Sequence, residues 1–221
     1  MATAKPNQGA RDEILARVRT ALTHSAPKRP SAPSEATFPP VENLLERFLS
    51  EAAGNYMEVL VTADSTGTAA ALREVISSLP EGILFAQDTP VLRQLLASAL
   101  PQPADGRSVQ WSSAGGPVES SRATISACEA LVALTGSVLV SSGGCGGRGA
   151  SVVAPCHIVV ANQGQLLPDL EAALARVRQI AFQNSYVGLI TGCSRTSDIE
   201  KKLILGAHGP QRLVVILQTG S

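Results

Sequence analysis

The sequence has few aromatic residues and no excess of either charge. Phe, Trp and Tyr make up 3% of the 221 residues, and 18 Lys and Arg residues balance 18 Asp and Glu residues. Proteins that bind nucleic acid need a basic surface for the phosphates and, for single strands, aromatic side chains on which bases stack. We therefore do not expect nucleic acid among the partners.

Long apolar runs are also missing. No segment approaches the roughly 18 consecutive apolar residues that a membrane-spanning helix requires. The N-terminal residues 1–10 are polar and lack the apolar stretch of a signal peptide. The sequence thus predicts no membrane span and a cytoplasmic protein.

Cysteine and histidine are too sparse and too scattered to form a familiar metal motif. No Cys-x-x-Cys pair occurs, and the spacings fit neither a zinc nor an iron–sulfur template. We interpret the cysteines as reduced thiols, some of them in the core, and expect neither a cofactor nor a metal. Histidines without a clustered carboxylate partner are more often structural than catalytic. The residues concerned are Cys128, Cys145, Cys156, Cys193, His24, His157 and His208.

The chain divides into a short N-terminal part and a larger body. In residues 11–23, apolar side chains recur at helical spacing, and Ile14, Val18 and Leu22 lie on one face of the predicted helix. Five prolines follow between Ser25 and Pro40, which indicates a linker or an extended arm. We therefore expect a helical arm and linker over residues 1–40 and a domain over residues 41–221.

The body alternates short apolar strands with amphipathic helices. Its 44% hydrophobic content and mean hydropathy of +0.15 favour a folded core. Buried strands that alternate with helices are typical of a largely parallel sheet covered on both sides, an α/β fold. Gly54 suits a helix C-cap, and Asp88 or Thr89 precedes a helix with Pro90 in its first turn. The predicted strands are 58–62, 83–86, 108–111, 137–141, 157–161, 187–191 and 213–218, and the predicted helices are 41–54, 72–79, 89–99, 168–184 and 197–203.

A glycine-rich segment, residues 144–149, fits the pattern Gly-x-Gly-x-x-Gly. In a dinucleotide site this pattern precedes a helix whose N-terminus meets the pyrophosphate, but here a strand follows instead. The segment also lacks the Gly-Lys-Ser/Thr of a phosphate-binding loop. Two interpretations remain, a hairpin-like loop over a site with Arg148 as an anion contact, and a mobile surface loop.

The segment 191–200 carries the strongest local signal for a ligand. A predicted buried strand, 187–190, runs into a turn and then a helix start, and ligands of open α/β sheets bind at the carboxyl ends of strands. Ser194 and Thr196 offer hydroxyls, and Arg195 offers a fork for phosphate or carboxylate. A structural alternative is specific too, because Ser197 and Glu200 fit a capping box.

Two further features stand upstream. Thr135, Gly136 and Ser137 precede a strand, where the glycine allows either the close approach of a ligand or a simple turn. Glu129 lies close to this turn. It is either a nucleophile or base or, more commonly, a solvated or helix-capping side chain.

Four segments resemble the LUD-domain family, in particular its lactate utilisation protein C group. They are the helix Arg11–Arg19, the Thr-Gly-Ser turn 135–137, the segment with Pro155 and His157, and the segment from Thr191 through Asp198 to the Gly-x-His-Gly-Pro of 206–210. Two positions depart from the pattern. Leu134 stands where the family often has an acidic residue, and Cys193 stands where proline is common.

The resemblance implies a fold and a pathway. The fold is a three-layer α/β architecture similar to NagB/RpiA/CoA-transferase-like proteins, a Rossmann-like domain with the helical arm at its N-terminus. The pathway is oxidation of L-lactate to pyruvate beside iron–sulfur partner proteins. The candidate ligand-binding residues are Thr135, Gly136, Ser137, Arg148, His157, Thr191, Gly192, Ser194, Arg195, Thr196, Asp198 and His208, with no catalytic residue assigned.

Two hypotheses of function follow. The first is an accessory, non-redox subunit of a lactate-oxidising system that binds a partner and a small anionic ligand, phosphate or carboxylate. The second is an enzyme acting on a sugar phosphate, a CoA ester or a folate-like substrate, with Glu129 or Asp198 as acid or base. It rests on fold analogy. A fold without any ligand is a third, less specific possibility.

Overall fold

The computed structural model describes residues 8–24, 37–100, 106–193, 195–196, 204–205 and 209–220. The chain forms two compact units, residues 1–37 and residues 38–221. In the first unit, α1 (Gln8–Leu22) is an amphipathic helix that starts before the predicted residue 11. Its apolar side chains Ile14, Val18 and Leu22 are exposed within this unit.

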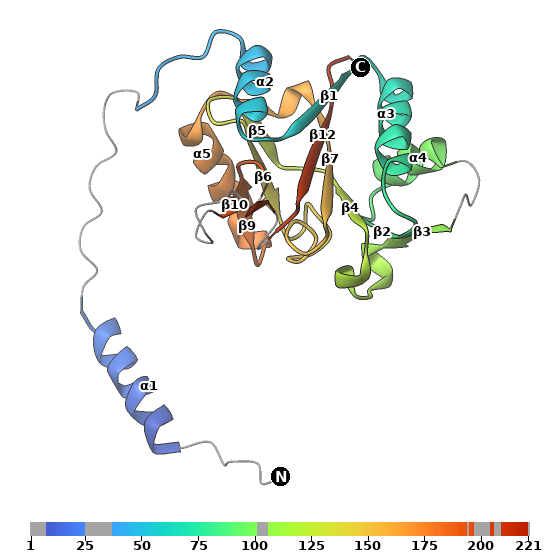
Figure 1. Ribbon diagram of the computed structural model, residues 1–221. Helices are drawn as coiled ribbons and strands as arrows, with labels where there is room; N and C mark the ends of the chain where they lie inside the picture. Colours follow the sequence, from blue (N-terminus) through green and yellow to red (C-terminus); the bar gives the residue numbers. More distant parts are fainter. Residues whose placement is uncertain are drawn as a thin grey trace. The chain divides into compact units, whose positions relative to one another are not determined.

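The second unit is built on a parallel sheet of six strands in the order β1-β12-β7-β4-β2-β3, as Figure 1 shows. Every neighbouring pair in this sheet is parallel. The predicted parallel α/β fold is therefore confirmed. The strands are β1 (Glu58–Thr62), β2 (Gly82–Ala86), β3 (Arg107–Trp111), β4 (Ala123–Ser126), β7 (Cys156–Asn162) and β12 (Arg212–Gln218).

A second, smaller sheet of four strands has the order β8-β5-β6-β9. Here β5 pairs antiparallel with β6, and β6 pairs antiparallel with β9, whereas β5 and β8 are parallel. The strand predictions for β6 and β9 are correct, but this separate sheet was not predicted. The strands are β5 (Ala130–Val132), β6 (Ser137–Ser141), β8 (Leu166–Leu167) and β9 (Val187–Ile190).

The large sheet is covered differently on its two faces (Figure 1). On one face α3 (Ser65–Ser77) and α4 (Pro90–Ala99) bury a core with the sheet residues Ile158 and Ile216. On the other face α2 (Leu44–Gly54) and the small sheet share a second core with Val159 and Val215. Residues of β7 and β12 alternate between these two cores because successive side chains of a strand point to opposite faces. The helix α5 (Leu170–Ile180) contacts β5 of the small sheet.

The helix ends follow local side-chain signals in most places. Thr89 accepts a hydrogen bond from the Leu92 amide and Pro90 begins α4, as predicted. The prediction for α2 is wrong at its end, because Gly54 is the last helical residue and Asn55 is the C-cap. The left-handed residue that redirects the chain is Tyr56, at φ 58°. Short 3₁₀ helices, η1 to η4, span Ser112–Ala114, Val118–Ser120, Gln163–Gln165 and Ala181–Gln183.

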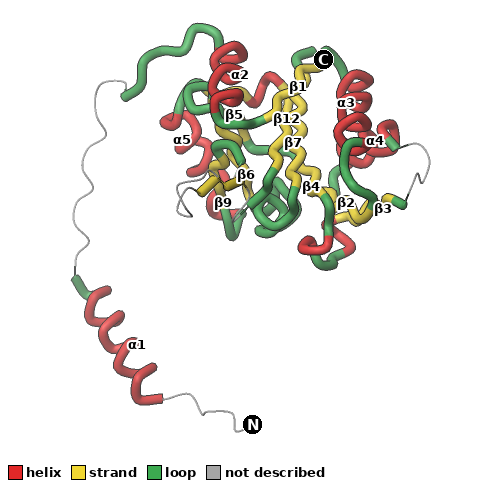
Figure 2. Tube along the Cα trace, viewed as in Figure 1, coloured by secondary structure: helices red, strands yellow, loops and turns green. Residues whose placement is uncertain are grey.

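The glycine-rich loop is not hairpin-like, contrary to one of the two interpretations of its sequence. It joins β6 to β7, which belong to different sheets, and Figure 2 shows it in green below β7. Further along, β10 (Arg195–Thr196) pairs antiparallel with β11 (Ile204–Leu205). The predicted helix 197–203 lies outside the described residues. Among the helices that the structure describes, none has the length and hydropathy needed to cross a bilayer.

Candidate functional site

The turn 134–137 packs directly on the backbone of α2. Gly136 has φ +60°, and a Cβ at this position would lie 2.5 Å from the Ala52 nitrogen and 2.6 Å from the Glu51 carbonyl carbon. No side chain fits at such distances, and the positive φ favours glycine as well. The glycine is therefore explained by the close approach of α2.

The turn that follows β9 packs on the same end of α2. Gly192 has φ +84°, and a Cβ there would lie 2.0 Å from the carbonyl oxygen of Asn55. Cys193 is buried, and its thiol donates to the Tyr56 carbonyl oxygen over 3.3 Å. Two turns from distant parts of the sequence thus converge on residues 51–56.

Hydroxyl groups tie the two turns to each other. The Ser137 hydroxyl lies 2.7 Å from the Thr135 hydroxyl and 2.7 Å from the Thr191 hydroxyl. The Asn55 side-chain amide donates to the carbonyl oxygens of Thr135, at 3.0 Å, and of Glu51, at 2.9 Å. Because Ser137 is fully buried, the hydroxyls that the sequence indicated as ligand contacts bond to one another in this structure. We call this cluster of Asn55, Thr135, Ser137 and Thr191 the turn cluster.

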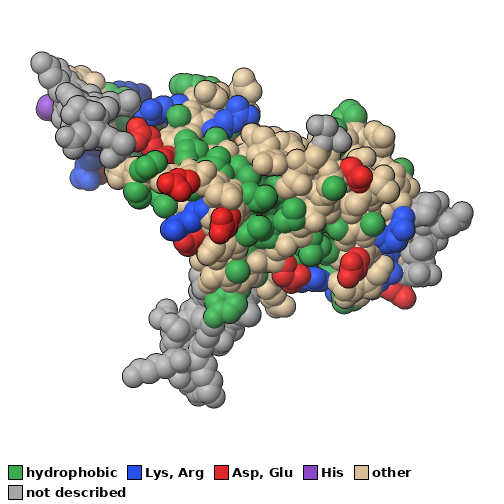
Figure 3. Space-filling model, turned by 90° about the horizontal axis from the view of Figure 1, so that it is seen from above, with side chains coloured by type: hydrophobic (Ala, Val, Ile, Leu, Met, Phe, Trp, Pro, Cys, Tyr) green, Lys and Arg blue, Asp and Glu red, His purple; other side chains and the backbone are tan. Residues whose placement is uncertain are grey.

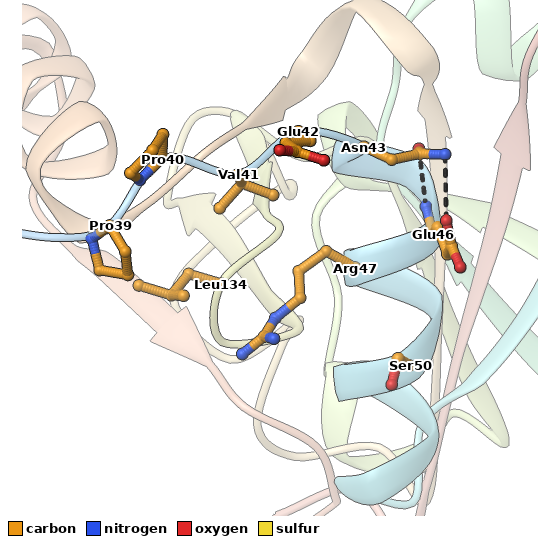
Figure 4. Close-up of a pocket in the computed structure, with 9 residues that line it drawn as sticks. All are labelled: Pro39, Pro40, Val41, Glu42, Asn43, Glu46, Arg47, Ser50 and Leu134. Carbon is orange, nitrogen blue, oxygen red and sulfur yellow. Dashed lines mark hydrogen bonds between the residues drawn. The ribbon is translucent and has the colours of Figure 1, made fainter.

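A hollow of about 460 Å³ lies between the turn 134–137 and the first half of α2 (Figure 4). In Figure 4 the Arg47 side chain extends from α2 towards Leu134. Its guanidinium pairs with Glu51 at 2.8 Å. Glu42 and Glu46 also line the hollow, so its carboxylates outnumber its single cation. The remaining lining residues are Pro39, Pro40, Val41, Asn43 and Ser50.

His157 lies away from solvent, in the core between the two sheets. It is fully buried on β7, its Nε2 lies 2.9 Å from the Ser126 hydroxyl, and its Nδ1 has no hydrogen-bond partner among the described residues. Because the Ser126 hydroxyl also donates to the Ala127 carbonyl oxygen at 2.8 Å, its single proton is used there and the imidazole proton is assigned to Nε2. Burial lowers the pKa of His157 from 6.5 to about 4. The imidazole is therefore neutral near pH 7.

The glycine-rich loop is anchored rather than free. The Gly144 amide donates to the Ser141 hydroxyl at 2.8 Å, and that hydroxyl donates to Glu129 at 2.7 Å. Arg176 of α5 pairs with the second carboxylate oxygen of Glu129 at 3.1 Å. Arg148, at the exposed end of the loop, donates through Nε to the Ser185 hydroxyl at 3.0 Å.

The loop is also held to the carboxyl ends of two strands of the large sheet. Gln87, just after β2, donates to the Gly143 carbonyl oxygen at 3.3 Å and accepts from the Ala127 amide at 2.9 Å. Sequence reasoning missed Gln87 and Asn55. The only signals were their positions, one directly after a strand and one after the glycine that ends a helix.

The structure brings together five of the predicted ligand-binding residues, Thr135, Gly136, Ser137, Thr191 and Gly192. His157 and Arg148 lie apart from these five, His157 in the core beside Ser126 and Arg148 in the glycine-rich loop beside Ser185. Ser194, Asp198 and His208 lie outside the described residues. For Arg195 and Thr196 the structure describes the backbone pairing of β10 with β11.

The four cysteines are free and buried. Burial raises the pKa of the Cys128 thiol to about 12 and that of Cys156 to about 11. It also raises the pKa of Cys145. Within the described part of the chain, no group of three or more Cys, His, Asp and Glu side chains is arranged to hold a metal ion.

The surface carries mixed charge. The face seen in Figure 3 shows acidic and basic side chains interspersed with apolar ones, without an extended basic area on the residues described. This agrees with the neutral composition, in which 18 basic residues balance 18 acidic ones. A basic footprint for nucleic acid is not seen on this face.

Comparison with known proteins finds similarity to one family, most clearly in the second half of the chain. Residues 117–218 match the model of the LUD domain. Lactate utilization protein C of Bacillus subtilis (strain 168) is 29% identical over 171 residues, which are 72% of this chain and 71% of that protein. Lactate utilization protein C of Geobacillus thermodenitrificans is 26% identical over 172 residues, 72% of each chain.

The fold agrees with a solved structure. The crystal structure of a DUF162 family protein from Deinococcus radiodurans superposes with a TM-score of 0.60 at 16% sequence identity, and the match covers 80% of this chain and 96% of that one. At this identity the likeness concerns the fold. The LUD-domain match over residues 117–218 and the similarity to proteins named Lactate utilization protein C agree with the resemblance found in the sequence.

Proposed function

We propose that this protein is an accessory, non-redox subunit of a cytoplasmic iron–sulfur system that oxidises L-lactate to pyruvate. The observation that carries the proposal is the similarity to two proteins named Lactate utilization protein C, which extends over 72% of this chain in each case. The match to the LUD-domain model, over residues 117–218, includes both turns of the turn cluster.

The environment of the thiols supports a non-redox role. Cysteines react and exchange electrons as thiolates, so reactive ones are partly exposed and have a low pKa. Cys128, Cys145 and Cys156 have the opposite properties, because they are buried and burial raises their pKa. In this proposal the redox groups belong to the partner proteins.

The proposal includes a small anionic ligand, and Arg148 is its best-supported contact. Arg148 is exposed, and its only hydrogen bond among the described residues is the one from Nε to Ser185. The two terminal nitrogens of the guanidinium remain available for a phosphate or a carboxylate. Arg148 lies in the loop held by Ser141 and Glu129, so its position is fixed by the scaffold.

The alternative function is an enzyme of this fold acting on a sugar phosphate, a CoA ester or a folate-like substrate. The favouring observation is Glu129, whose side chain is 15% exposed and whose carboxylate is oriented by Ser141 and Arg176. A partly buried carboxylate held in one orientation is a candidate acid or base. If substrate turnover were found, a Glu129→Gln variant with unchanged turnover would remove this residue from the enzyme hypothesis.

The accessory role is tested by purifying the tagged full chain from cells that encode it and that grow on L-lactate. The proposal predicts that proteins containing iron and acid-labile sulfide copurify with the chain, and that fewer do so from cells grown without lactate. A chain that emerges alone under both conditions, while remaining folded, would contradict a stable accessory subunit.

A further inference from the structure

A cleft lies between α3 and α4, on the face of the large sheet opposite the turn cluster. It has a volume of about 590 Å³, and its floor includes Val160 of β7 and Gln218 of β12, at the carboxyl ends of these strands. In sheets of parallel strands, ligands bind outside the carboxyl ends. We call this space the α3–α4 cleft.

One end of the cleft has fixed polar groups. The Thr68 hydroxyl is buried and donates to the Asp64 carbonyl oxygen at 2.8 Å. It also lies 2.7 Å from the Thr62 hydroxyl and 3.3 Å from the side-chain oxygen of Gln218. The Gln218 amide nitrogen donates to the carbonyl oxygen of Gly220 at 2.9 Å. These bonds hold Gln218 in one orientation, so this end presents preorganised rather than mobile polar atoms.

The other end carries an arginine without an acidic partner. Arg73 donates through Nε to the Ala99 carbonyl oxygen and through Nη2 to the Ser98 carbonyl oxygen, each at 2.8 Å. Its Nη1 makes no hydrogen bond to the described residues, and the described residues that line the cleft include no Asp or Glu. The two carbonyl bonds fix the guanidinium plane, and no carboxylate among the described lining residues neutralises its delocalised charge.

The wall between the two ends includes apolar side chains beside Gln94. Val91 on α4 is 70% exposed, and Val160 is the residue at which the otherwise buried face of β7 becomes partly accessible. Exposed aliphatic side chains beside a fixed cation match a ligand that has an apolar body and an anionic group.

We propose that the α3–α4 cleft binds a small organic anion, with its phosphate or carboxylate on Arg73, its apolar body against Val91 and Val160, and its other end near Thr68 and Gln218. This site is separate from Arg148 and from the turn cluster. The proposal is independent of the lactate role, and either can fail while the other holds.

The test measures the thermal stability of the full chain with four probes, inorganic phosphate, AMP, CoA and hexanoate, so that phosphate esters are distinguished from carboxylates. A bound ligand raises the melting temperature as its concentration exceeds the dissociation constant. We expect AMP, CoA or hexanoate to stabilise the protein, and phosphate alone to do so more weakly because it has no apolar body.

Three variants locate the binding. Arg73→Ala is expected to weaken it roughly tenfold to a hundredfold, the cost of a lost charge-assisted hydrogen bond. Ala70→Trp keeps the arginine but places a large side chain in the cleft from an exposed helix position, and is expected to abolish binding. Arg107→Ala is the matched control, because Arg107 also donates to helix-end carbonyl oxygens, at Leu79 over 2.7 Å, without lining the cleft.

The outcomes separate clearly. Stabilisation that persists in Arg107→Ala and is lost in Arg73→Ala and in Ala70→Trp supports the site. No stabilisation by any of the four probes, or stabilisation that is equal in all variants, overturns the proposal.

Discussion

The buried imidazole of His157 makes the stability of the domain dependent on pH. Its pKa is lowered from 6.5 to about 4 because a charged imidazolium would lose its solvation in the core. Its single hydrogen bond, to Ser126 at 2.9 Å, does not offset that loss. Unfolding returns the side chain to water, where its pKa is ordinary.

The sign of the effect follows from proton binding. Between pH 6.5 and about 4 the unfolded chain binds a proton at this position and the folded chain does not. Stability from the neutral imidazole is thus fully present above pH 6.5 and is lost as the pH falls through this window. The difference between the two pKa values corresponds to about 3 kcal/mol of unfolding free energy.

The test variant is His157→Leu. It replaces the imidazole with an apolar side chain of similar size that does not bind a proton. Urea unfolding followed by circular dichroism, at about pH 7.5 and about pH 4.5, gives the loss of unfolding free energy on acidification. The loss should be about 2 to 3 kcal/mol smaller in His157→Leu than in the wild type. Asp88 does not account for this difference between the variant and the wild type. Its pKa is lowered from 3.8 to about 2, so the folded protein titrates there below the pH range of the assay.

The control is His24→Leu, because His24 is exposed and belongs to the first unit. It should keep the pH dependence of the wild type. If His157→Leu and the wild type lost the same free energy on acidification, the assignment of a neutral buried His157 would be refuted.

Three further predictions concern stability and reactivity. Gly192→Ala should destabilise the domain by more than about 2 kcal/mol in urea unfolding, because its Cβ would lie 2.0 Å from the Asn55 oxygen; a loss below about 0.5 kcal/mol would contradict the close approach. Gly54→Ala, at a helical position with no atom within 4 Å of the added Cβ, should instead stabilise it by about 0.5 to 1 kcal/mol in the same assay. The Cys128 thiol, buried and with its pKa raised to about 12, should resist a thiol reagent in the folded protein and react in urea; mass spectrometry of the labelled peptides checks this, and rapid native labelling would show that the thiol is accessible.

Much of the fold could be predicted because its signals are local. The strand Glu58–Thr62 is a short apolar run between a turn and a helix, and α4 has its cap at Thr89 and its proline at Pro90, each within a few residues of the helix start. A parallel sheet follows from alternation of such units. These predictions needed no knowledge of which segments meet in space.

The small sheet could not be predicted in the same way. β5 has three residues and β8 has two, too few for any periodicity. Their parallel pairing joins Leu131 to Leu166, and such contacts between distant segments leave no local pattern in the sequence. The hairpin-like interpretation of the glycine-rich loop was wrong because the strands on its two sides, β6 and β7, belong to different sheets.

The candidate site was predictable in part. Gly136 and Gly192 were singled out as positions that a ligand could approach, and in the structure the backbone of residues 51–55 lies close to both. Asn55 bonds to Thr135 across 80 positions of sequence, so it gave no signal as a member of this cluster. A turn glycine indicates that something comes close, and the structure is needed to show what does.

The proposed role, an accessory non-redox subunit in L-lactate oxidation, can be tested by reconstitution. The most direct measurement mixes the purified iron–sulfur partner proteins with L-lactate and an electron acceptor, with and without this chain, and follows pyruvate. If the proposed role is right, pyruvate forms faster when the chain is present. This effect is retained in folded variants in which one cysteine at a time is replaced, at Cys128, Cys145, Cys156 or Cys193. Equal rates of pyruvate formation with and without the chain would contradict it.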